Sequence, residues 1–174
     1  MSPSRGYEDY SGLDLTRIIV KPLYFGMLVN IIAPMAGLFV CYWLNNQDTP
    51  MENRVGDFAN TLYYIIGAVA LSQAGLALWW RQKSFARPMV RSMESFEDDL
   101  RDSLIAASKP VFILIAAISL WGYLYFFLTG RFNEGAFVVL FSFVVFQVIR
   151  PRQGGLKKLI DRQRQLVKEG KLLR

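Results

Sequence analysis

Four long apolar runs divide the chain. Residues 22–44 carry no charged side chain, and similar runs follow at residues 58–80, 110–128 and 135–149. A helix on the surface of a soluble protein needs a polar face, whereas about 20 consecutive apolar residues let a helix cross the roughly 30 Å hydrocarbon core of a membrane. The pattern therefore predicts an all-α integral membrane protein with four transmembrane helices arranged as two hairpins.

Small residues indicate which faces of these spans pack against each other. Helices in a membrane approach closely where small side chains recur at intervals of three or four residues. The second run has such a stripe, and the first run offers a matching pair, so we expect spans one and two to be in close contact. These residues are Gly67, Ala70, Ala74 and Ala77 in the second run, and Ala33 and Gly37 in the first.

The fourth run is the shortest, and its side chains are large almost all round. Residues 137–146 consist of Phe, Val and Leu apart from Ser142. Bulky side chains keep neighbouring backbones apart, so this composition is unfavourable for tight helix packing. We expect the fourth span to face lipid or an apolar partner subunit and to contribute little to a four-helix core.

The basic residues are concentrated in three of the five segments that flank the runs. Of the twenty Lys and Arg, three lie in residues 1–21, six in residues 81–109 and nine in residues 150–174, and one lies in each of the two other connections. Cytoplasmic segments of membrane proteins are enriched in Lys and Arg. The distribution predicts a multi-pass protein of the cell (inner) membrane with both termini and the middle connection in the cytoplasm.

Two of the predicted cytoplasmic segments have the periodicity of amphipathic helices. Residues 89–108 combine an apolar stripe with acidic side chains on other faces, and residues 155–169 combine an apolar stripe with basic ones. Both helices could lie on the membrane surface, with the tail attracted to anionic lipids, pair with each other, or dock a larger partner. The candidate lipid or partner contacts are Met93, Phe96, Leu100, Lys157, Lys158, Arg162 and Arg164.

Charged side chains are missing from all four runs. Intramembrane charges usually mark proton relays and coupled-transport sites, so their absence counts against a pump. Among the few polar residues, Pro34 cannot donate a hydrogen bond to the carbonyl of Asn30, four residues earlier. Gln73 lies at a similar distance from the cytoplasmic end of its own span as Asn30 does. Asn30, Pro34 and Gln73 therefore form a candidate intramembrane polar site, either a structural hydrogen bond at a kink or a small functional site.

The composition excludes several kinds of chemistry. There is no His, and the single Cys41 cannot form an internal disulfide, so haem and zinc sites lack their usual ligands. The chain has no glycine-rich phosphate loop, and the acidic residues between Glu94 and Asp102 fit no recognised metal-binding spacing. We therefore expect no cofactor, no bound metal and no enzymatic activity. The basic residues are not accompanied by a nucleic-acid-binding pattern, so we expect no nucleic-acid partner.

These observations favour a single membrane domain over residues 1–174 that acts as a structural, assembly or accessory subunit of a larger membrane complex. Its expected partners are membrane lipids and other membrane-protein subunits, with a hetero-oligomer favoured over a homo-oligomer. The alternative is a small self-associating transporter or channel for a polar solute or lipid, built around Asn30, Pro34 and Gln73.

Overall fold

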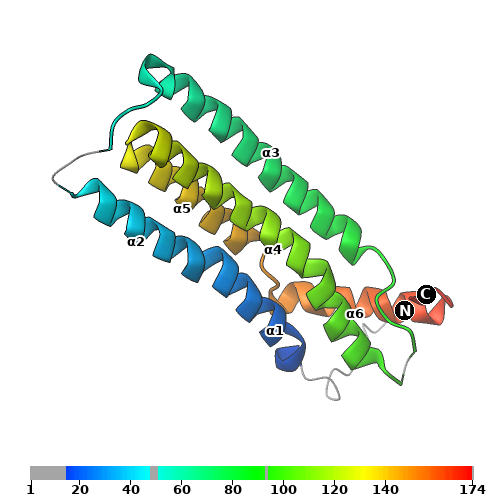
Figure 1. Ribbon diagram of the computed structural model, residues 1–174. Helices are drawn as coiled ribbons and strands as arrows, with labels where there is room; N and C mark the ends of the chain where they lie inside the picture. The colour runs from blue at the N-terminus through cyan, green and yellow to red at the C-terminus, as the bar shows by residue number, and fades with distance from the viewer. Residues whose placement is uncertain (1–14, 48–50, 93, 174) are drawn as a thin grey trace, which may run out of the picture.

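A computed structural model describes residues 15–47, 51–92 and 94–173, and these residues contain helices and no strand. The elements follow in the order α1 (Leu15–Met27), a π-helical turn η1 (Leu28–Ile32), α2 (Ala33–Asn45), a 3₁₀ turn η2 (Gly56–Phe58), α3 (Ala59–Phe85), α4 (Phe96–Thr129), α5 (Phe132–Ile149) and α6 (Gln153–Lys168). Figure 1 shows α1 to α5 as an elongated bundle, with α6 across one of its ends.

Four stretches of this bundle are long and apolar enough to cross a membrane. They are Ile18–Asn45, Gly56–Phe85, Phe96–Thr129 and Phe132–Ile149. Each contains one of the four runs expected from the sequence. The prediction of an all-helical membrane protein with four candidate transmembrane helices is therefore confirmed.

The first and third apolar runs begin at Pro22 and Pro110, but neither proline begins a helix. Pro22 lies inside α1 and Pro110 inside α4, so the stretch 89–108 is not a separate helix, and its later part is the beginning of α4. A proline removes one backbone hydrogen bond, but packing on both sides can hold a helix continuous through it. In α4, Leu104 before the proline and Val111 after it are both buried.

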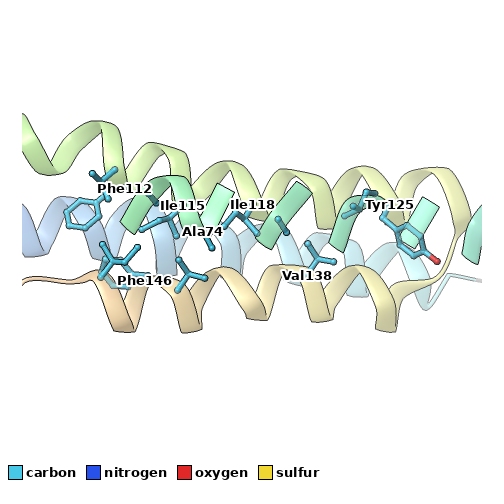
Figure 2. Packing of buried hydrophobic residues seen from close by; sticks show 13 residues of the cluster. Ala74, Phe112, Ile115, Ile118, Tyr125, Val138 and Phe146 are labelled. Carbon is cyan, nitrogen blue, oxygen red and sulfur yellow. The ribbon is translucent and has the colours of Figure 1, made fainter. Parts of the chain in front are cut away.

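The helices α4 and α5 form the centre of the bundle. Their backbones approach at Gly122 and Gly135, where a Cβ atom on Gly122 would lie 2.5 Å from the Gly135 carbonyl oxygen. This approach lets α5 bury Val138 and Phe146 in the core (Figure 2). The expectation that the fourth span contributes little to the core was therefore wrong, although the opposite face of α5, which includes Phe137, is exposed.

The helix α3 and the first span lie on opposite sides of α4 and α5 (Figure 1). The small residues Ala70, Ala74 and Ala77 of α3 are buried, but in the core that α4 and α5 supply. In the first span, Gly37 packs against Tyr123 of α4. The predicted close contact between spans one and two was wrong, because both spans pack against the central helices instead. Of the small residues in the prediction, Ala33 is exposed and Gly67 has no neighbour within 4 Å of an added Cβ atom.

A second apolar core lies at the end of the bundle that carries α6. It joins one face of α6 to the beginnings of α1 and α4 and to the connection between α3 and α4. The buried residues are Ile18, Ile19, Met89, Val90, Phe96, Leu100, Leu104, Leu156, Leu159 and Ile160. The α6 helix is thus an integral part of the fold.

We predict that replacing Gly122 with Ala lowers the free energy of unfolding by about 1–3 kcal/mol, because the added methyl group must push α4 and α5 apart. The matched control is Gly67→Ala in α3, where a Cβ atom would have no neighbour within 4 Å. Unfolding of the purified variants in detergent by increasing dodecyl sulfate measures the difference. Equal stability of the two variants would contradict the importance of this contact.

Candidate functional site

The first span contains a π-helical turn directly before Pro34. In this turn the backbone N–H of Ala33 bonds to the carbonyl of Leu28, five residues earlier. Such turns frequently occur at functional sites. Asn30 lies in the turn, is fully buried, and donates from Nδ2 to the Gly26 carbonyl at 3.1 Å. Its Oδ1 atom has no hydrogen-bond partner among the described residues. Burying this oxygen therefore costs free energy.

The carbonyl of Pro34 is bound from the neighbouring helix. The hydroxyl of Tyr123 in α4 donates to this oxygen at 2.6 Å. The ring can come this close because Gly37 has no side chain, and a Cβ atom there would lie 2.6 Å from it. Tyr123 was not among the residues that the sequence analysis identified. Pro34 is therefore tied to α4 by a specific hydrogen bond.

Gln73 is also bound by α4 and not by the first span. Its Oε1 atom accepts a hydrogen bond from the indole N–H of Trp121 at 3.0 Å. On a further side of α4, the hydroxyls of Ser119 and Ser142 are hydrogen-bonded at 2.7 Å and fully enclosed. Asn30 and Pro34 thus share one stretch of helix, but Gln73 lies across α4 from them, and the structure does not assemble the three into one site.

Two apolar hollows open on the sides of the bundle. One, of about 500 Å³, lies between α3 and α5 beside Gly67 and is lined by Tyr63, Tyr64, Phe137 and Phe141, among others. The second, of about 330 Å³, lies beside Pro34, and Asn30 is not part of its lining. Apolar hollows of this kind suit a lipid chain or a neighbouring helix better than a polar solute.

The candidate contacts at the α6 end lie on two different faces. Phe96 and Leu100 are buried in the second apolar core. Lys157, Lys158 and Arg162 are exposed on the other face of α6, and Arg164 is partly exposed. Met93 lies outside the described residues. The apolar stripes of the two segments therefore pack together within one molecule, which leaves the basic face of α6 as the surface available to lipid or a partner.

A buried amide fixes α6 to the connection between α3 and α4. Gln163 is completely buried, and its Oε1 atom accepts the backbone N–H of Met89 at 2.9 Å. Its Nε2 atom donates to the Arg87 carbonyl at 3.0 Å. Beyond α6, the backbone N–H of Leu173 bonds to the Val90 carbonyl at 2.9 Å. These bonds satisfy backbone groups of a non-helical segment that would otherwise be costly to bury.

The acidic side chains at the start of α4 are engaged locally. Arg101 forms ion pairs with Asp98 at 2.9 Å and Asp102 at 3.1 Å. Asp99 accepts the hydroxyl of Ser95 at 2.7 Å. Within residues 15–47, 51–92 and 94–173, no group of three or more His, Cys, Asp or Glu is arranged to hold a metal ion.

Comparison of this chain with protein-family models, curated proteins and solved structures finds no match. The functional argument therefore depends on the geometry described above.

We predict that Asn30 and Gln73 act independently. Gln73→Leu removes the bond to Trp121 and lowers the free energy of unfolding by about 0.6 kcal/mol. Because α4 separates the two side chains, the effects of Asn30→Leu and Gln73→Leu should add within about 0.5 kcal/mol in a double-mutant cycle. A coupling energy well above this value would show instead that the two residues share one polar site.

Proposed function

We propose that this protein is a non-catalytic subunit of a larger membrane complex, with a structural, assembly or accessory role, and that it binds a transmembrane helix of a different subunit against α3. The observation that carries this proposal is the open face of α3 beside Gly67. The proposal accounts for the exposed side of a helix whose other side packs against α4, and for the small residues there that close helix packing requires.

The burial of α3 supports a partner on this side. Only 22% of its most apolar 18-residue window is buried, compared with 44% for the corresponding window of α4. The first span is also little buried, at 17%, and α3 differs from it by the larger hollow beside Gly67, of about 500 Å³. The exposed face of α3 includes Ala68, Ser72 and Gly75. The Ser72 hydroxyl donates to the Ala68 carbonyl at 2.8 Å, so it needs no partner from another helix. Small residues at this spacing allow a second backbone to approach.

Both termini, α6 and the connection between α3 and α4 are proposed to lie in the cytoplasm, at the inner face of a cell membrane, with the four spans threaded as two hairpins. Eighteen of the twenty Lys and Arg flank the spans on that side. In this arrangement α6 is an amphipathic helix whose exposed Lys157, Lys158 and Arg162 attract anionic lipid headgroups.

A self-associating transporter or channel is the alternative. The centre of the bundle is filled by buried apolar side chains, and the gap beside Arg81 and Ser108 measures only about 10 Å³. A solute pathway would therefore have to form between copies of the chain. Unchanged solute flux in reconstituted vesicles after replacement of Asn30 and Gln73 by Leu would count against this alternative.

For the partner helix, we predict that Ala68→Leu abolishes co-purification of the other subunits in mild detergent, because the larger side chain fills the open face of α3. The matched control is Ala36→Leu on the exposed face of α2, which makes the same chemical change elsewhere on the bundle. Quantitative mass spectrometry of affinity-purified complexes from the native membrane measures the loss.

Both variants should keep the monomer folded, because each new side chain points outward from an exposed position. Co-purification that is equally strong with Ala68→Leu, or a wild-type protein that purifies alone, would refute the partner-helix proposal.

For the orientation, we predict that cysteines introduced at Lys158 and at Glu52 are labelled from opposite sides of the membrane. A membrane-impermeant maleimide applied to intact spheroplasts should label the cysteine at position 52, and the one at position 158 should react only after permeabilisation. The background variant Cys41→Ala removes the natural thiol. Labelling of both positions from the same side would overturn the proposed threading.

A further inference from the structure

Three arginines from distant parts of the chain converge at the α6 end of the bundle. Arg150 and Arg152 flank Pro151 in the link between α5 and α6, and Arg81 near the end of α3 lines the same small gap as Pro151. Arg81 is only partly exposed. In the described part of the chain, none of the three forms an ion pair with Asp or Glu. Like charges held together without a counter-ion repel each other, and a bound anion would relieve this repulsion.

The link between α5 and α6 forms one wall of a hollow of about 300 Å³. Its lining includes Arg150 and Arg152, and the opposite wall is α1. One guanidinium nitrogen of Arg152 donates to the Gln147 carbonyl at 3.0 Å, which fixes the side chain beside α5. A guanidinium carries five N–H donors, so this bond leaves others for a ligand.

The α1 wall of the hollow changes from polar to apolar along the helix. It begins with the hydroxyl of Thr16 and continues with Ile19, Val20 and Leu23. Seven residues separate Thr16 from Leu23, which corresponds to about 10 Å along the helix axis. The hollow thus combines the cationic groups of Arg150 and Arg152 and a hydroxyl with hydrocarbon side chains.

We propose that this hollow binds an anionic membrane phospholipid. Arg150 and Arg152 hold the phosphate, for which the planar guanidinium is well suited, and Ile19, Val20 and Leu23 contact the acyl chain. Arg81 adds positive charge from the other side of Pro151. The first backbone N–H groups of α6 have no side-chain cap and supply a further weak attraction for an anion.

The apolar wall is the reason to choose a lipid over free phosphate. Inorganic phosphate would use the arginines but would gain nothing from Ile19, Val20 and Leu23. The site is also distinct from the exposed basic face of α6, because the arginines of the hollow come from the link before that helix and from α3. The inference depends on the bundle lying in a membrane but not on the proposed partner helix.

The test is the thermal unfolding midpoint of the purified full-length protein in a neutral detergent. Phosphatidylglycerol at about a hundredfold excess over its Kd should raise the midpoint by about 5 °C or more, whereas phosphatidylcholine and inorganic phosphate should raise it much less. The double variant Arg150→Gln/Arg152→Gln should lose most of this shift. The matched control Arg54→Gln/Lys109→Gln removes the same charge from exposed positions outside the hollow and outside α6, and it should keep the shift.

The single variant Arg81→Gln separates ligand binding from folding. Its unfolding midpoint without lipid serves as the reference, because the substitution removes a like charge from beside Arg152 and also the contact of Arg81 with the Phe85 ring at 5.3 Å. With phosphatidylglycerol its shift should be smaller than that of the wild type. Circular dichroism shows whether the double variant folds. If it does not, the shift of Arg81→Gln with phosphatidylglycerol decides whether the arginines bind the lipid.

Three results would overturn the proposal. Shifts of equal size with phosphatidylglycerol and phosphatidylcholine would mean that the anionic headgroup is not recognised. An equal shift with inorganic phosphate would identify a site for a free anion instead of a lipid. Full retention of the phosphatidylglycerol shift in the double variant, or in Arg81→Gln where the double variant does not fold, would place lipid binding elsewhere on the protein.

Discussion

The bundle depends on the close approach of α4 and α5 at Gly122 and Gly135. Between helices in lipid there is no hydrophobic driving force comparable to that in water, so association relies on packing and hydrogen bonds at short range. Because neither Gly122 nor Gly135 has a side chain, the two backbones come near enough for close packing and for hydrogen bonds between the helices. Ser119 and Ser142, whose hydroxyls lie 2.7 Å apart, form their bond because the helices have already come together at this distance.

Once α4 is central, three of its polar side chains connect it to the other three spans. Ser119 bonds to α5, Trp121 to Gln73 of α3, and Tyr123 to the Pro34 carbonyl of the first span. Ser119 and Tyr123 are four residues apart and therefore share one face of α4, toward α5 and the first span, whereas Trp121 lies on the opposite face, toward α3. The polar groups that the membrane segments contain are therefore used to position the outer spans around α4.

The sequence predicted the number and approximate position of the spans, because the thickness of a membrane imposes a minimum length on each apolar run. It did not predict their arrangement. Ala70, Ala74 and Ala77 identify a packing face, but a stripe of small residues has the same pattern whichever helix lies opposite. Pro22 and Pro110 are local signals of a helix start. The packing of residues before and after each proline nevertheless keeps α1 and α4 continuous through it.

The candidate site was limited in the same way. Asn30 and Gln73 were paired because they lie at similar depth, and depth says nothing about direction around the bundle. Their actual partners, the Gly26 carbonyl and Trp121, follow from a helix distortion and from a long-range contact. A tryptophan within an apolar run is typical of a buried or interfacial position and carries no signal of the amide that it binds.

The contact made by Gln163 has a consequence for the order of assembly. The segment that it caps, around Arg87 and Met89, is synthesised more than seventy residues earlier. Until α6 is present, the Met89 N–H and the Arg87 carbonyl can bond only to water, and the apolar side chains of α1 and α4 that α6 covers are exposed. The connection between α3 and α4 can therefore complete its folded set of hydrogen bonds only after α6 has been synthesised.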